Sequence, residues 1–96
     1  MSGPRIEEIR AALEARLQPL ELEVLDESAA HAGHAGAREG GHYRVHIVSE
    51  HFRGHPPLAR HRLVYEALAG LMGRGIHALA IRAETADEIS RGKPPR

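Results

Sequence analysis

The sequence predicts a single α+β domain in which helices cover one face of a small β-sheet. Apolar residues recur every three or four positions in two segments, which is the period of an amphipathic helix. Two other segments alternate apolar and polar residues, as half-buried strands do. The chain has 96 residues, enough for one modest core but not for two. We therefore predict one domain over residues 1–96, with a core from about 4 to 90 and the order helix, strand, strand, helix, strand, helix.

The N-terminal part is predicted to form a helix and a strand. The helix begins near Pro4, a residue that suits the first helical turn, and ends before Pro19. Its apolar face consists of Ile6, Ile9, Leu13 and Leu17. A strand should follow over residues 20–25, with inward and outward side chains in alternation. The inward set is Leu20, Leu22 and Val24, and the outward set is Glu21 and Glu23.

A long segment then separates this strand from the next one. Residues 26–41 have no helical or strand period and contain a tandem His-Ala-Gly, which starts at His31 and again at His34. Loops of this length are uncommon inside small domains and are usually either functional or disordered. Residues 42–49 alternate again, and their inward side chains should be Tyr43, Val45 and Ile47. The two strands should pair as an antiparallel hairpin with an overlong tip.

The next predicted element is an amphipathic helix. Before it, Phe52 should anchor the connection 49–57 in the core, and Gly54 should form a turn. The helix starts near Leu58 and must end in the segment 70–75, where three glycines occur in six residues. Its apolar stripe consists of Val64, Ala67, Leu68 and Leu71.

The chain should end with a strand and a short helix. Residues 76–81 are too few and too apolar for a surface helix, so we predict a buried strand that continues to about Ala83. Thr85 can cap a helix that runs to about Ser90. Residues 91–96 should form a frayed tail.

Composition excludes several functions. Thirteen basic and thirteen acidic side chains cancel, so no global positive field attracts DNA or an anionic membrane. The absence of cysteine excludes disulfides, thiol catalysis and a cluster held by the chain's own thiolates. We find no apolar run of membrane-spanning length and no signal peptide, and we expect a cytoplasmic protein. Without a Walker loop, an HExxH motif or a nucleophilic serine context, we predict that the protein is not an enzyme.

The eight histidines are the unusual feature of the composition. His31 and His34 lie three apart in a glycine-containing loop and could face one ion, although a closed zinc site needs four ligands. The alternative is a solvated loop with incidental histidines. His42 and His46 would be roughly 13 Å apart along a strand, too far to chelate one metal.

Two further histidines lie in the C-terminal half. His77 has the parity of Leu79 and Ile81, so it should start on the core side of the sheet and reach its edge. A lone histidine in that position is more often a hydrogen-bonded structural residue than a ligand. His61 lies on the apolar stripe of the helix and should be semi-buried. Its neighbours Arg60 and Arg62 could contact phosphate or an acidic partner, or could be ordinary surface arginines.

The chain resembles proteins of the BolA family from about Pro4 to Thr85. The resemblance is carried by Asp26-Glu27-Ser28, by Val48-Ser49-Glu50-His51-Phe52-Arg53-Gly54, by Leu58 with Arg60-His61-Arg62-Leu63-Val64-Tyr65, and by Ile76-His77-Ala78-Leu79-Ala80-Ile81. It implies a sandwich like a type II KH domain, with a three-stranded mixed sheet and helices on one face. KH domains hold nucleic acid with a GxxG loop between two helices. The corresponding connection here, residues 53–57, lacks that motif, and we interpret Gly70-Leu71-Met72-Gly73 as the end of a helix.

The resemblance also implies a function. BolA-like proteins are partners of monothiol glutaredoxins, with which they share a [2Fe-2S] cluster, and some regulate transcription in bacteria. The glutaredoxin cysteine and glutathione hold one iron, and the BolA partner holds the other. The family's two ligands fall on His77 and on His31, with His34 as a close substitute. On this reading His77 is a ligand rather than a structural residue, Arg60, His61 and Arg62 lie near the partner surface, and the isolated chain holds no cluster.

Two alternatives stay open. The first is a DNA-binding transcription regulator that uses a local basic cluster, formed by Arg53, Arg60, Arg62 and Arg74. The zero net charge and the missing GxxG loop oppose it. The second is adventitious binding of zinc or nickel by the His-rich loop. Without its partner, we expect the chain to be a monomer or a weak homodimer.

Overall fold

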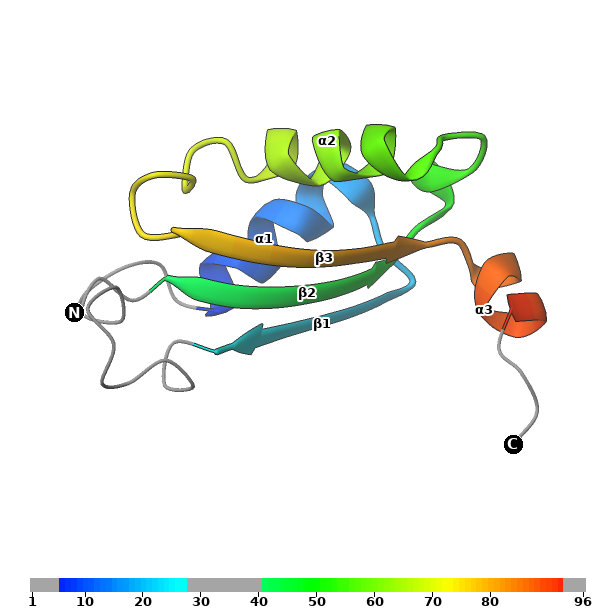
Figure 1. Ribbon diagram of the computed structural model, residues 1–96, viewed down its shortest axis with the longest axis horizontal. Helices are drawn as coiled ribbons and strands as arrows, with labels where there is room; N and C mark the ends of the chain where they lie inside the picture. The colour runs from blue at the N-terminus through cyan, green and yellow to red at the C-terminus, as the bar shows by residue number, and fades with distance from the viewer. Residues whose placement is uncertain (1–5, 28–40, 93–96) are drawn as a thin grey trace.

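The computed structural model describes residues 6–27 and 41–92, and it confirms the predicted order of elements (Figure 1). The helices are α1 (Ile6–Leu17), α2 (Pro57–Ala67) and α3 (Ala86–Gly92), and a 3-10 turn, η3, covers Glu50–Phe52. The strands are β1 (Glu21–Asp26), β2 (His42–Val48) and β3 (Ala78–Glu84). The last helix therefore runs two residues beyond the predicted Ser90 and includes part of the expected tail, of which residues 93–96 lie outside the described chain.

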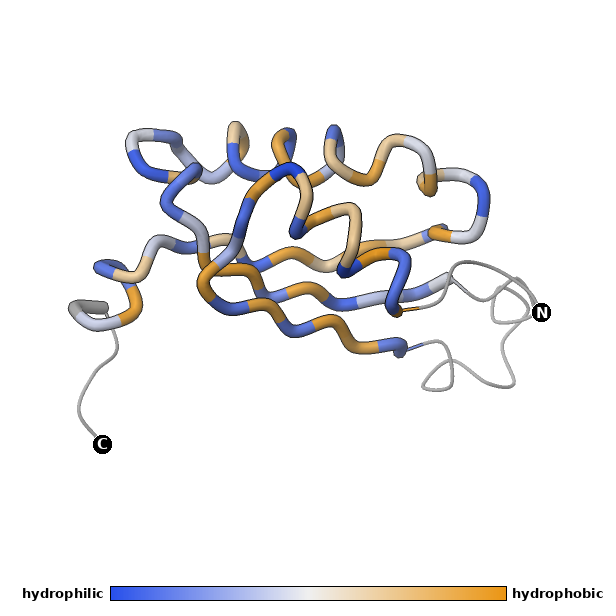
Figure 2. Tube along the Cα trace, turned by 180° about the vertical axis from the view of Figure 1, so that it is seen from behind, coloured by the Kyte–Doolittle hydropathy of each residue, from blue (hydrophilic) through white to orange (hydrophobic). Residues whose placement is uncertain are grey.

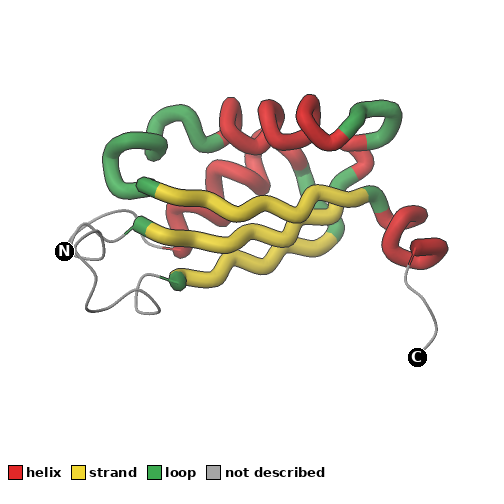
Figure 3. The backbone as a smooth tube through the Cα atoms, in the orientation of Figure 1, coloured by secondary structure: helices red, strands yellow, loops and turns green. Residues whose placement is uncertain are grey.

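The three strands form one mixed sheet in the order β1-β2-β3. β1 and β2 are antiparallel, with Val24 opposite Val45, and β2 and β3 are parallel, with Val45 opposite Ile81. Both α1 and α2 lie on the same face of this sheet, while α3 lies at one end (Figures 1 and 3). The predicted mixed sheet with helices on one face is therefore confirmed, and so is the antiparallel hairpin of its first two strands.

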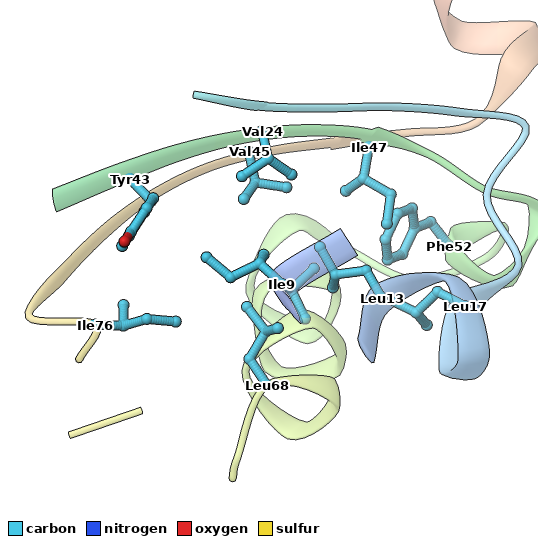
Figure 4. Packing of buried hydrophobic residues seen from close by; sticks show 11 residues of the cluster. Ile9, Leu13, Leu17, Val24, Tyr43, Val45, Ile47, Phe52, Leu68 and Ile76 are labelled. Atoms are coloured by element: carbon cyan, nitrogen blue, oxygen red, sulfur yellow. The ribbon is translucent and has the colours of Figure 1, made fainter. Parts of the chain in front are cut away.

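The core lies between the sheet and the two long helices (Figure 4). The sheet contributes Tyr43, Val45 and Ile47, all on the inward side that alternation predicted. The helices contribute the predicted stripes, Ile9, Leu13 and Leu17 from α1 and Val64 and Leu68 from α2 and the turn after it. Phe52 is fully buried, as expected of the residue that anchors the connection between β2 and α2. Gly54 follows in a turn with φ +82°.

The structure differs from the prediction at Leu20. Its side chain is 62% exposed, and it precedes β1 rather than pointing inward from it. The reason is the turn that ends α1. Gln18 has a left-handed φ of +46°, a backbone conformation that ends the helix before Pro19.

The third strand, β3, also differs from the prediction in its first residue and in its burial. It begins at Ala78 rather than Ile76, and it is an edge strand whose residues alternate between half-buried and exposed. The predicted strand is therefore present, but it begins two residues later and is half-buried rather than buried. A short apolar run does not distinguish a central strand from an edge strand that packs one face on helices. Figure 2, which views the molecule from behind, shows the strands in alternating polar and apolar steps.

Candidate functional site

The candidate site lies at the end of the sheet where β1 finishes and where β2 and β3 both begin (left in Figure 1). This convergence follows from the pairing, in which Asp26 is opposite Tyr43 and Tyr43 is opposite Leu79. His77 immediately precedes β3 at this end. The predicted loop histidines, His31 and His34, belong to residues 28–40, which lie outside the described chain. Both described ends of that segment, Glu27 and Gly41, are at the same end of the sheet as His77.

Gly41 fixes the backbone of His77. Its carbonyl oxygen accepts hydrogen bonds from the amides of His77, at 2.8 Å, and Ala78, at 3.0 Å. Gly41 has φ +74°, and a Cβ atom there would lie 2.1 Å from the carbonyl oxygen of Gly75 and 2.9 Å from the amide nitrogen of His77. Only glycine allows this close approach of the two chain segments. The end of the His-rich segment is therefore attached directly to the predicted ligand residue.

His77 is exposed although its neighbour Ile76 is buried. Ile76 is 2% exposed and belongs to the core, where it forms a bridge with Met72. Before it, Gly73 turns with φ +80°, and its amide bonds to the carbonyl of Ile76 at 3.3 Å. The chain then bends at His77 before β3 starts, and the side chain of His77 is exposed. The prediction that His77 shares the inward direction of Leu79 and Ile81 is therefore wrong, and its imidazole is accessible to a partner.

A shallow depression lies beside this position. Its volume is about 270 Å³, and it is lined by Glu27, His42, Tyr43, Ala78, Leu79 and Ala80. Glu27 is oriented here by its amide, which donates to the carbonyl of His42 at 2.7 Å, and by its carboxylate, which accepts from Arg44 at 2.9 Å. Burial, and then the negative charges of Asp26 and Glu8, raise the pKa of Tyr43. The phenol therefore stays neutral at physiological pH.

The described residues do not by themselves complete a metal site. No group of three potential metal-ligating side chains occurs within 6–27 and 41–92. His42 and His46 lie on β2 four residues apart, and His46 is paired with Glu84 at 2.9 Å. An iron or zinc ion at His77 would therefore need ligands from residues 28–40 or from another molecule.

The Arg60-His61-Arg62 segment lies at the opposite end of the sheet from His77. Arg60 donates to the carbonyl of Ala83 near the end of β3, at 3.1 Å. Ala83 is five residue steps along the strand from Ala78, which corresponds to about 17 Å. The structure thus does not bring the predicted partner-binding arginines together with the predicted ligand. His61 is half-buried on its helix, as predicted from its place on the apolar stripe.

Arg60 also has an internal role that the sequence did not reveal. Its side chain is only 12% exposed and forms a bidentate ion pair with the carboxylate of Glu88. Its Nε donates to the carbonyl of His55 at 2.7 Å. In the predicted basic cluster, Arg53 is likewise paired, with Glu50 and Asp87. Arg62 and Arg74 are exposed, and neither has an ion pair in the part of the chain that is described. Two of the four positive charges are thus neutralised within the protein.

Comparison with known sequences gives one family. The model of the BolA-like protein family matches residues 13–88. BolA-like protein 1 of Mus musculus is 49% identical over 84 residues, which are 88% of this chain and 60% of the mouse protein. The DNA-binding transcriptional regulator BolA of Escherichia coli K12 is 42% identical over 82 residues, 85% of this chain and 76% of that protein. The SufE-like protein 1 of Arabidopsis thaliana, named chloroplastic/mitochondrial, is 43% identical over 93 residues, 91% of this chain but only 25% of that protein.

Solved structures agree with this result. The BolA domain of SufE1 from Arabidopsis thaliana has a TM-score of 0.78 and 44% identity, covering 92% of this chain and 99% of that domain. A protein of the same kind from Babesia bovis has a TM-score of 0.80 and 29% identity, covering 97% and 98%. The matches indicate no catalytic family. Among the described helices, none is long and apolar enough to span a membrane, and the cytoplasmic location stays a prediction.

Proposed function

This chain belongs to the BolA-like protein family, and from that premise we propose that it is an adaptor in iron–sulfur cluster assembly or trafficking. In this proposal it shares a [2Fe-2S] cluster with a monothiol glutaredoxin. The chain has no cysteine, so it contributes imidazole nitrogens to one iron, as histidines do in Rieske centres. The thiolates on the other iron come from the glutaredoxin and glutathione. The cluster is cargo that the two proteins hold jointly.

The observation that carries this proposal is the position of His77. Its side chain is exposed at the end of the sheet, and its backbone amide is bonded to Gly41, the residue that follows the His-rich segment. A ligand to a shared cluster must be accessible to a second protein, and a buried core histidine would not be. The second ligand is proposed to be His31 or His34, in the segment between Glu27 and Gly41, whose two described ends lie at the same end of the sheet as His77.

The test is reconstitution with a cluster-loaded monothiol glutaredoxin in the presence of glutathione. Visible absorption and circular dichroism report the iron ligands, and size-exclusion chromatography reports the complex. We expect His77→Ala to abolish or shift the heterocomplex spectrum, and either His31→Ala or His34→Ala to do the same. His55→Ala is the matched control, because His55 is exposed and lies on the connection to α2, near Arg60. A complex of His77→Ala with an unchanged spectrum would show that the ligand assignment is wrong.

A second candidate function is DNA binding, which the name of the Escherichia coli relative favours. Since Arg53 and Arg60 are engaged in ion pairs, the contacts to phosphate would depend on Arg62 and Arg74. Fluorescence anisotropy with promoter fragments and with random DNA, over a range of salt concentrations, tests it. A regulator should bind a promoter fragment more tightly than random DNA, and its affinity should fall steeply with salt concentration. Equal affinities for the two DNAs would count against a regulator.

A further inference from the structure

The outer edge of β1 has unused hydrogen-bonding groups. In an antiparallel pair, alternate residues direct their N–H and C=O groups toward the neighbouring strand. The amide of Glu27 bonds to His42, so by alternation Glu21, Glu23 and Leu25 face β2. Leu22 and Val24 therefore direct their backbone groups away from the sheet, along an edge that no other strand of the described chain covers (Figures 1 and 3).

Each outer edge of the sheet has one outward carbonyl that accepts from an arginine of a helix. On β3 the outward carbonyl of Ala83 accepts from Arg60, whose helix α2 lies along that side. On β1 the carbonyl of Leu22 accepts from Nη1 of Arg10 at 3.0 Å. Val24, which follows on the same edge, has no such bond to its outward groups in the described structure. The unprotected part of the β1 edge thus begins just beyond Leu22.

The chain segment that forms this edge is strongly negative, while Arg44 and Arg82 lie beyond it on the open face with Glu23. Residues 6–27, which form α1 and β1, contain seven acidic and two basic side chains. The acidic residues are Glu7, Glu8, Glu14, Glu21, Glu23, Asp26 and Glu27. Glu21 and Glu23 are exposed on the open face of the sheet, and neither forms an ion pair within the described chain. The zero net charge of the whole protein therefore conceals an acidic segment, residues 6–27.

We propose that the β1 edge receives an extended, basic segment of a partner protein, which adds to the sheet as a fourth strand. Strand addition uses the outward backbone groups of the edge for affinity and alternate side chains for specificity. Lysine or arginine at every second position of the incoming segment would lie opposite Glu21 and Glu23 on the open face. A second copy of this chain is a poor occupant, because it would place acidic residues opposite acidic residues. This edge does not involve His77, so the inference is independent of cluster binding.

The test uses a synthetic ten-residue peptide of alternating lysine and threonine, with blocked ends, added to the full-length chain. Amide hydrogen exchange and ¹H–¹⁵N NMR are followed residue by residue. We expect the outward amides of Leu22 and Val24 to gain protection at saturation. The amides of Glu23 and Leu25, which already bond within the sheet, should change little. A peptide of the same composition, with its lysines in one block, should protect these amides much less.

Variants then separate strand addition from simple charge attraction. The double variant Glu21→Lys with Glu23→Lys reverses both exposed charges. It should weaken peptide binding about ten-fold, because two attractive cross-strand pairs with the lysines of the peptide become repulsive. Glu66→Lys makes the same type of change on the exposed surface of α2 and should leave the affinity within about two-fold. A peptide of alternating glutamate and threonine should not bind.

Three results would overturn the proposal. The first is no added protection at Val24 with millimolar peptide. The second is an equal response to the blocked-lysine peptide, which would indicate diffuse adsorption to the acidic surface. The third is protection confined to the amides of β3, which would place the added strand on the other edge.

Discussion

The guanidinium of Arg60 and the carboxylate of Glu88 form a two-bond ion pair, with Nη1–Oε1 and Nη2–Oε2 distances of 2.7 and 2.8 Å. The same carboxylate accepts from the amide of Thr85 at 3.0 Å, and the hydroxyl of Thr85 accepts from the amide of Glu88 at 3.3 Å. This is a capping box at the start of α3. One carboxylate therefore both caps α3 and attaches it to α2.

The ion pair predicts a specific pH dependence of stability. The hydrogen bond from Arg60, and then that from the backbone of Thr85, lower the pKa of Glu88 to about 2 from a usual value of 4.5. Because the pKa is lower in the folded state, the stabilisation is complete above about pH 5 and is lost as the pH falls from about 4.5 to 2. Glu88→Gln should therefore cost on the order of 1 kcal/mol at pH 7, a value reduced by the partial exposure of the carboxylate. Urea unfolding between pH 2 and pH 7 measures this difference.

The control for this prediction is Glu66→Gln, which removes an exposed carboxylate from α2. Its difference from the unmodified protein should stay within about 0.5 kcal/mol over the same range. If the Glu88→Gln difference also stayed constant down to pH 2, the ion pair would contribute nothing to folding.

A second prediction separates the two arginines that flank His61. Arg60→Ala should destabilise the protein by about 2 kcal/mol, because it leaves Glu88 and two backbone carbonyls without their donor. Arg62→Ala should change stability by less than about 0.5 kcal/mol, since its side chain is exposed. Arg60→Lys should recover only part of the loss, because an ammonium cannot form the two-bond contact. Thermal and urea unfolding of the three variants measure these changes in the free energy of unfolding. Equal decreases for Arg60→Ala and Arg62→Ala would contradict the prediction.

The parts of the fold that sequence could predict are those with a local period. Val64 on α2 and Leu68 just after it, and Tyr43 and Val45 on β2, follow spacings that depend only on the geometry of one element. The contact of Arg60 with Glu88 joins residues 28 positions apart, and no local sequence pattern predicts it. The N-terminal cap of α3 is easier to predict from sequence, since Thr85 followed three residues later by Glu88 is a recognisable pattern.

The geometry of the candidate site could be predicted less well from sequence periodicity. Alternation predicted that His77 points inward, because the bend between Ile76 and β3 has no reliable signal in a glycine-rich segment. The role of Gly41 depends on a contact with Gly75, more than thirty residues away, and only the paired strands bring them together. The proposal that His77 is a ligand rests on the family resemblance rather than on its own neighbourhood.

A third prediction concerns Gly41. In Gly41→Ala, the new Cβ would meet the backbone of Gly75 at 2.1 Å, and the residue would keep a left-handed φ. We expect a loss of more than about 3 kcal/mol, from the clash and the strained backbone together. Gly54→Ala is a matched control, because Gly54 has a similar φ of +82° but nothing within 4 Å of the added atom. It should cost about 1 kcal/mol, the backbone term alone. Similar midpoints of urea unfolding for the two variants would contradict the close approach.

A fourth prediction concerns Ser49, a fully buried polar residue between β2 and the 3-10 turn. Its hydroxyl donates to the carbonyl of Leu17 at 2.6 Å and accepts from the amide of His51 at 3.0 Å. It thus satisfies one of the carbonyls left over at the end of α1 and starts the turn that positions Phe52. Ser49→Ala should cost about 1–3 kcal/mol, because it leaves both groups without their partner. Ser90→Ala, an exposed change in α3, should stay within about 0.5 kcal/mol, and urea unfolding that gives equal values for both serines would refute this role of Ser49.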